Sequence, residues 1–184
     1  MTINEAKAIL TDWVHSPSLL THSKAVANSA LHFAKVLNIP DREFDNYYIT
    51  GLLHDADYEK YPEEHPLMII DYLKKRDDVP SYIIDAIYAH RYNDKIDSLL
   101  DKVLFASDEI SGFVYACILV RPNKLIDGLN VSSVKKKLKD KSFCSPVNRE
   151  DIYKAAAYFD NMDFDTYIQH VIDAFILNRE ELNI

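Results

Sequence analysis

The apolar residues of the chain recur every three or four positions, which is the spacing that places side chains on one face of an α-helix. The pattern is clearest between residues 19 and 37, and its members are Leu19, Ala25, Val26, Ala30, Phe33, Ala34 and Leu37. No segment alternates apolar and polar residues in the way that a pair of strands would. The pattern therefore predicts an all-α fold, a single helical bundle.

Several helix starts are marked by capping residues. Thr2 and Glu5 form a capping box, Ser16 precedes a proline suited to the first helical turn, and Pro40 with Asp41 begins a third helix. We expect further helices over 66–76, 81–91, 98–120, about 131–139, about 148–159 and about 164–181. The sequence predicts one domain over 1–184, with a core at about 16–120 and a short appendix of C-terminal helices at about 121–184.

Composition narrows the class of protein. The chain has 184 residues, of which 48% are apolar, and a net charge of −8. An acidic chain is a poor general binder of nucleic acid, because affinity for the duplex comes mostly from Lys and Arg. No apolar run approaches the ~20 residues needed to cross a bilayer, and the charged N-terminal segment does not resemble a signal peptide. We expect a cytoplasmic protein with no membrane contact; its oligomeric state is left open.

Three polar residues lie on apolar helix faces. His22 shares its face with Ala25 and Val26, His90 follows two buried-type isoleucines at helical spacing, and Asp108 follows Leu104 and Phe105. Burying an ionised aspartate costs several kcal/mol unless a cation compensates it. Each residue taken singly also fits a hydrogen-bonded core position.

Further polar residues are expected at helix ends. His54 and Asp55 end the third helix, where two adjacent side chains can reach one centre, and Gly51 one turn earlier allows close approach. His65 precedes Pro66, so we expect it at the N-cap of the following helix. The convergence of all these residues predicts a metal site, and nitrogen and carboxylate donors without thiolate suit zinc, iron, manganese or nickel.

The same residues carry a resemblance to the HD superfamily of metal-dependent phosphohydrolases. It covers about residues 18–120 and comprises His22 in LLTHSKAV, His54 and Asp55 in GLLHDAD, and Asp108 in LFASDEISGF. His65 in EEHP and His90 in AIYAHRYN match the subset with two extra histidines, as in dinuclear diadenosine-tetraphosphate hydrolases. The run LLHDADYEKYPEEHP is also similar to predicted HD hydrolases of unknown substrate.

The resemblance implies a metal-dependent hydrolase with two divalent ions, whose identity (Fe, Mn, Zn, Ni or Mg) is open. It implies that one ion is held by His22, His54, Asp55 and Asp108, and a second by His65 and His90 with Asp55 bridging. His54 and Asp55 are the expected catalytic pair. A hydroxide between the ions would attack a small anionic phosphoester, a nucleotide or related phosphometabolite.

Departures from the family patterns exclude some substrates. No paired His-His and no GYP element follow the HD pair, so cyclic dinucleotide cleavage of that type is not expected. The ppGpp hydrolases place a Glu-Asp pair beyond HD and do not need both extra histidines, so they fit less well.

Two other functions fit the same residues. One is an HD-type oxygenase that uses a mixed-valence diiron pair, and the other is a non-catalytic nucleotide-sensing module. Lys102 and Arg121 are candidates for substrate-binding contacts with phosphate, with a surface charge as the alternative. The lysine-rich run 135–141 either draws an anionic substrate to the site or is a solvated face.

Overall fold

The computed structural model describes the backbone of residues 1–184 and the side chains of residues 1–92 and 94–184. Helices make up 65% of the chain, and no strand occurs in the part described. The predicted all-α fold is confirmed. In chain order the α-helices are α1 Ile3–Trp13, α2 Pro17–Val36, α3 Phe44–Leu53, α4 Leu67–Leu73, α5 Ser81–Arg91, α6 Leu99–Leu119, α7 Val131–Leu138, α8 Arg149–Ala156, α9 Phe164–Leu177 and α10 Arg179–Leu182.

The helix boundaries agree with the predicted starts more closely than with the predicted ends. The capping box at Thr2 and Glu5 forms as expected, and a short 3₁₀ turn, Asp41–Glu43, precedes α3. The last predicted helix is two helices, because Asn178 leaves the helical conformation (φ −120°, ψ 21°). Its side-chain amide donates to the carbonyl of Ala174, so the side chain competes with the backbone for that acceptor.

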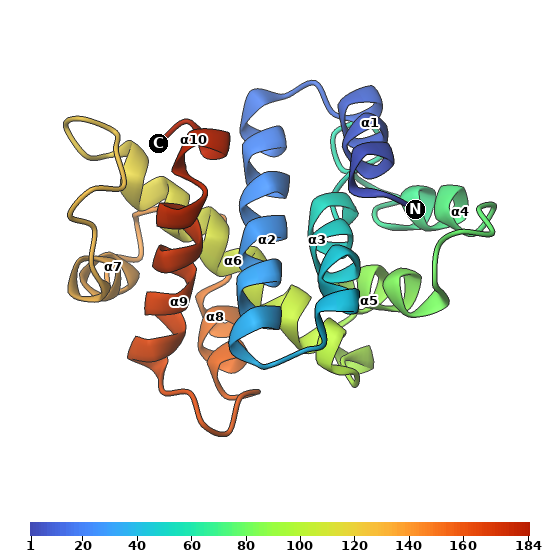
Figure 1. Cartoon of the computed structure of the whole chain (residues 1–184). Coiled ribbons are helices and arrows are strands. Elements are labelled where there is room, and N and C mark those ends of the chain that lie inside the picture. Colours follow the sequence, from blue (N-terminus) through green and yellow to red (C-terminus); the bar gives the residue numbers. More distant parts are fainter.

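Helix α2 runs through the middle of the molecule and packs against α3 on one side and α6 and α9 on the other (Figure 1). The contact with α3 is close at Gly51, where a Cβ atom would lie 2.8 Å from the Cα of Ala27. Only glycine fits without a shift of the backbone. The expectation that Gly51 allows a close approach is confirmed, and this approach sets the position of the C-terminal end of α3.

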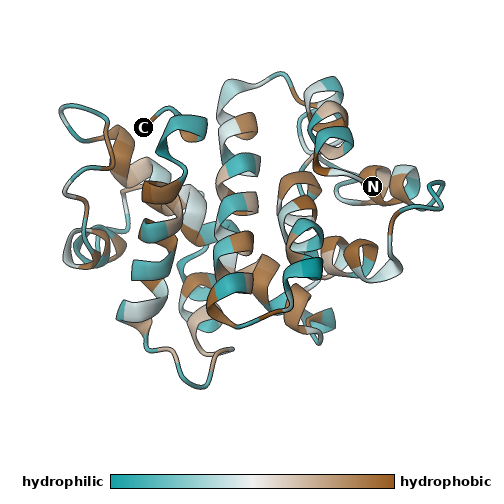
Figure 2. Cartoon of the chain, viewed as in Figure 1, coloured by the Kyte–Doolittle hydropathy of each residue, from teal (hydrophilic) through white to brown (hydrophobic). Residues whose placement is uncertain are grey.

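The C-terminal helices belong to the same core as the N-terminal ones. Phe33 of α2 stacks against Phe159 and against Tyr167 of α9, each with ring centroids 5.8 Å apart. The buried hydroxyl of Tyr167 donates to the carbonyl of Ala106 in α6 at 2.7 Å. Figure 2 shows apolar and polar residues alternating along α2 and α9, as expected for helices with one buried face.

Helix α7, which carries most of the lysine-rich run, lies at the edge of the molecule opposite to α4 (Figure 1). Of the helices described, none combines the length and apolar character that a membrane span requires. Helices α2, α3, α5 and α6 pack against one another, whereas α7 lies outside this group.

Candidate metal centre

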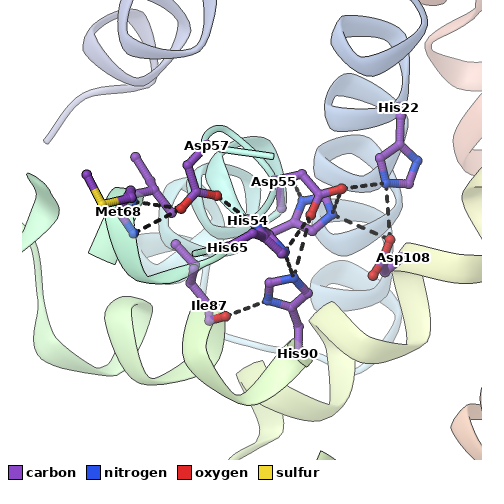
Figure 3. A network of polar contacts seen from close by, with 11 residues as sticks. His22, His54, Asp55, Asp57, His65, Met68, Ile87, His90 and Asp108 are labelled. Carbon is purple, nitrogen blue, oxygen red and sulfur yellow. Dashed lines mark hydrogen bonds and ion pairs between the residues drawn. The ribbon is translucent and has the colours of Figure 1, made fainter. Parts of the chain in front are cut away.

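Six side chains from five segments meet at the end of α3 (Figure 3). Each contributes an imidazole nitrogen or a carboxylate oxygen, and Asp55 lies in the middle of the group. They are His22 of α2, His54 and Asp55 after α3, His65 before α4, His90 of α5 and Asp108 of α6. All six candidate ligands named from the sequence are thus brought together by the fold.

One group of donors lies beside Oδ2 of Asp55. Nε2 of His22 lies 3.1 Å from Oδ1 of Asp108 and 3.5 Å from Oδ2 of Asp55. Nε2 of His54 lies 3.4 Å from each of the same two oxygens. These four donors could hold one metal ion.

A second group of donors lies beside Oδ1 of Asp55. Oδ1 lies 3.3 Å from Nε2 of His65 and 3.6 Å from Nε2 of His90, and these two nitrogens are 3.1 Å apart. Asp55 therefore faces both groups, one oxygen to each. This is the division into two sets that the resemblance implied.

The spacing of the donors fits ligands of a common ion. With bonds of about 2.1 Å, neighbouring ligands are separated by roughly 3.0 Å in octahedral and 3.4 Å in tetrahedral geometry. The contacts of the imidazole nitrogens with the carboxylates, and that between His65 and His90, are 3.1 to 3.6 Å long. No large movement of these side chains is needed for coordination.

Hydrogen bonds on the far side of three imidazoles fix their orientation. Nδ1 of His54 donates to the carbonyl of Gly51 at 2.8 Å, and Nδ1 of His90 donates to the carbonyl of Ile87. Nδ1 of His65 donates to Oδ1 of Asp57 at 2.7 Å. A carbonyl or carboxylate oxygen only accepts, so in each neutral ring the proton is on Nδ1 and the lone pair of Nε2 faces the centre.

The result is a set of acceptors that face one another. Nε2 of His54 is buried and has no hydrogen-bond partner in the described structure. Nε2 of His65 faces Nε2 of His90, and two lone pairs cannot bond to each other. A cation between these atoms satisfies all of them, so the residues present fit a metal ion.

The electrostatics of the centre point the same way. Burial opposes the ionisation of Asp55 and Asp108, but the adjacent imidazoles, above all His54, hold the pKa of both carboxyls well below the usual value. Burial also lowers the pKa of His54, yet the two carboxylates raise it well above its usual value. The centre stabilises positive charge against two ionised carboxylates.

His65 was expected at the N-cap of the helix that follows Pro66, and this prediction is wrong by one residue. The helix begins at Leu67 with Pro66 as its N-cap, so His65 lies one residue outside the expected cap position. The carboxylate of Asp57 satisfies the free N–H groups instead, because Oδ2 accepts from Met68 at 3.1 Å and from Ile69 at 3.0 Å. The imidazole of His65 is thereby released from capping and turns toward Asp55.

A cavity of about 660 Å³ opens beside the centre, within the usual size range of small-molecule sites. Its wall includes the exposed side chains of Tyr58 and Arg91, together with Glu109 and Asn148. Glu109 accepts a hydrogen bond from the backbone N–H of Asn148 at 3.2 Å. Burial, with a smaller contribution from the charge of Asp108, raises the pKa of Glu109 to about 7.

The two predicted phosphate contacts lie elsewhere. Neither Lys102 nor Arg121 is part of the cavity wall as far as the structure is described. Arg121 is 13 residues beyond Asp108, about 20 Å along the helix axis, and it donates to the carbonyl of Asp127. Lys102 is six residues before Asp108, about 120° around the axis. The substrate-binding role expected for them finds no support in this geometry.

None of the lysines in the run 135–141, all of which the structure describes, lines the cavity. Lys135 pairs with Asp165 of α9, and Lys136 and Lys137 line a different cavity together with Arg121. The geometry therefore favours the solvated face over the basic rim for these lysines.

Three residues of the wall, Arg91, Glu109 and Asn148, were not singled out from the sequence. Arg91 and Glu109 each follow a predicted ligand directly, so adjacency to a motif was the available signal. Asn148 comes from a segment 40 residues further along the chain than Asp108 and carries no motif. Only the packing of α8 against α6 brings it to the site.

The chain matches no protein-family model, no curated protein and no solved structure. The likeness to the HD superfamily thus stays an expectation from short motifs.

Proposed function

We propose that this protein is a metal-dependent phosphohydrolase of the HD type that acts on a small phosphoester, a nucleotide or a related phosphometabolite. The observation that carries the proposal is the position of Asp55, whose two oxygens face two separate groups of imidazole nitrogens. In the neutral form of three of these imidazoles, the nitrogen turned toward the centre carries a lone pair and no proton. An arrangement of this kind suits a pair of ions that share one carboxylate.

Divalent ions bound there would supply a nucleophilic hydroxide at neutral pH and neutralise charge on the phosphoryl oxygens. The protein's own residues would hold these ions and orient the imidazole rings that bind them. Asp55 contributes one oxygen to each group, and Asp108 contributes a second carboxylate to the group that contains His22 and His54. Asp57 fixes the ring of His65 and, through two backbone N–H groups, ties that ring to the start of α4.

The cavity supports a phosphorylated substrate with an aromatic or planar part. Arg91 is exposed, lines the cavity and forms no ion pair with another described residue, so its guanidinium is available to a phosphate. Tyr58 is 47% exposed and packs edge-on against His65, with ring centroids 5.3 Å apart. Its free ring surface beside the centre suits stacking with a nucleobase.

The test is a panel of phosphoesters and nucleotides, assayed for released phosphate with chain reconstituted separately with iron, manganese, zinc, nickel or magnesium. We expect turnover with at least one metal, and we expect Asp55→Ala to abolish it and to lower the metal content by two ions per chain. Asp85→Asn is the matched control, because Asp85 is an exposed aspartate of α5 away from the cavity. This control should retain metal and activity.

Three outcomes would overturn the proposal. Full activity in Asp55→Ala would reject the shared carboxylate as the basis of catalysis. Product formation that requires dioxygen, and that disappears in anaerobic assays of the iron-loaded chain, would replace hydrolysis with oxygenase chemistry at the same ligands. Nucleotide affinity without turnover under any metal would indicate the sensing module instead.

A further inference from the structure

A second set of histidine and carboxylate side chains lies between α2 and α9, on residues to which the sequence assigns no role. Nε2 of His32 in α2 is 3.3 Å from Nδ1 of His170 in α9, with ring centroids 5.4 Å apart. Asp173 follows His170 by three residues, so both project from the same face of α9. Three potential ligands therefore come from two helices that are distant in sequence.

The distances fit a cation. One ligand atom from each of His32, His170 and Asp173 lies within 4.8 Å of the other two. Any two ligands of a tetrahedral ion with bonds of about 2.1 Å are roughly 3.4 Å apart. The two imidazole nitrogens, 3.3 Å apart, already have this spacing, so a rotation of the Asp173 side chain would complete the set. All three residues are partly exposed, which leaves room for that rotation.

The surroundings hold this group in place and leave it open to water. The ring of His170 packs edge-on against Phe33, with centroids 6.1 Å apart, which restricts its orientation. Gln169 donates to Oδ1 of Asp173 at 2.8 Å, which keeps the carboxylate on the same face. His170 also borders a cavity of about 480 Å³, through which water can reach the remaining coordination positions.

This group is independent of the centre around Asp55. It shares no residue with that centre, and His32 follows His22 on α2 by ten residues, about 15 Å along the helix axis. The inference therefore stands whether or not the proposed function is correct.

We propose that His32, His170 and Asp173 bind one divalent cation of the zinc type and that the ion fastens α9 to α2. Two imidazoles and one carboxylate are ligands that zinc takes readily, with water in the remaining position. Because α9 contributes Tyr167 and Phe175 to the core, the ion would stabilise the packing of the C-terminal part of the chain. The alternative is a hydrogen bond between two neutral imidazoles with no metal.

The experiment measures zinc uptake by the full chain with Asp55 and Asp108 both changed to asparagine, so that the six-residue centre lacks its carboxylates. We expect this variant to bind one zinc ion per chain and to gain thermal stability on binding. Adding His170→Gln should abolish both effects, while adding His15→Gln should leave them unchanged, because His15 is an exposed histidine outside the group. Glutamine keeps a hydrogen-bonding group at position 170.

The proposal is overturned if the doubly substituted chain takes up no zinc, or if His170→Gln leaves uptake unchanged. Circular dichroism of the metal-free variants checks that they fold. Should His170→Gln unfold, Asp173→Asn makes the same test at a partly exposed position that is not in the core. Should the Asp55 and Asp108 variant unfold, the test is the loss of one zinc ion from the otherwise unaltered chain on His170→Gln.

Discussion

At the scale of single residues, the proton positions on the histidines decide what the centre binds. His54 is fully buried and its Nδ1 proton is held by the carbonyl of Gly51, one turn earlier in the same segment. His65 uses the carboxylate of Asp57 for the same purpose. In its neutral form, a histidine whose outer nitrogen is held in this way presents an unprotonated nitrogen inward, and this is the form that binds a metal ion.

Arg91 is the residue whose substitution most directly tests substrate binding. We expect Arg91→Gln to raise KM by roughly 10-fold to 100-fold, since a hydrogen bond to a charged group contributes about 1.5–3 kcal/mol. Metal content should not change, because Arg91 is not among the candidate ligands. The measurement is steady-state kinetics on the best phosphoester of the panel.

Lys102→Gln is the matched control for this substitution. Lys102 is a basic residue of α6 that does not line the cavity. The KM of the Lys102→Gln variant should therefore equal that of the unaltered chain. Equal KM values for Arg91→Gln and the unaltered chain would contradict the role of Arg91. A raised KM for Lys102→Gln alone would restore the contact expected from the sequence.

At the scale of elements, the approach of α2 to α3 is set by one glycine. We expect Gly51→Ala to lower the free energy of unfolding by about 1–3 kcal/mol, because the added methyl would meet the backbone of Ala27, which cannot rotate away. Urea denaturation measures the change. A loss below about 0.5 kcal/mol would show that the two helices separate at little cost.

Gly112→Ala is the control for a helical glycine beside the centre. Its added Cβ would lie 3.7 Å from Nδ1 of His22, an ordinary contact. Alanine favours the helix by up to about 1 kcal/mol over glycine, so this variant should be as stable as the unaltered chain or more so.

The short helix α10 is tied to three other helices through one carboxylate. Glu181 accepts from Lys7 of α1 at 2.8 Å, from Asn28 of α2 at 3.0 Å and from Tyr48 of α3 at 3.3 Å. Burial raises the pKa of Glu181, but the hydrogen bonds from Lys7 and Asn28 outweigh it, and the pKa lies below its ordinary value of 4.5. The ionised form is therefore favoured in the folded state.

We expect Glu181→Gln to destabilise the fold in a pH-dependent way. A carboxyl with a lowered folded-state pKa stabilises the fold above pH 4.5, and that contribution disappears as pH falls through the folded-state pKa. The cost should stay below about 1 kcal/mol, since the side chain of Lys7 is 43% exposed and solvent screens the pair. Urea unfolding between pH 7 and pH 3 measures it.

Glu180→Gln serves as the matched control, because Glu180 is an exposed neighbour in α10. It should show no such dependence on pH. If the free energy of unfolding of Glu181→Gln differed from that of the unaltered chain by the same amount at every pH, packing and not charge would hold α10 in place.

At the scale of the whole molecule, metal binding should couple the centre to global stability, because its ligands come from α2, the end of α3, the segment before α4, α5 and α6. At 100 times Kd a bound ligand adds about 2.7 kcal/mol, which for a chain of this size raises Tm by about 5–10 °C. Calorimetry of the His170→Gln chain, with and without chelator, isolates this centre from the group between α2 and α9.

Asp55→Asn in the same His170→Gln chain should remove the metal-dependent part of Tm. A chelator that leaves Tm unchanged in the chain that keeps Asp55 would show that the donors meet without holding an ion. The two results separate a metal centre from a hydrogen-bonded core cluster.

The sequence by itself determined the elements and the donors. Local spacing of apolar residues and capping residues such as Thr2 act within a few positions, so helix starts can be predicted from the chain alone. The inward direction of His22, His90 and Asp108 follows from the same periodicity. The prediction that His65 is the N-cap of α4 is wrong by one residue. The carboxylate of Asp57, which comes from an earlier segment, accepts the hydrogen bonds from the first turn of that helix.

Only the tertiary structure decided how these elements meet. Which oxygen of Asp55 faces which imidazoles, the arrival of Asn148 beside Glu109, and the meeting of His32 with His170 all depend on helices that are distant in sequence. Lys102 and Arg121 show the converse, since nearness to Asp108 in sequence does not place them beside it. Helical periodicity fixes the direction of a side chain, whereas the packing of buried faces fixes what lies opposite it.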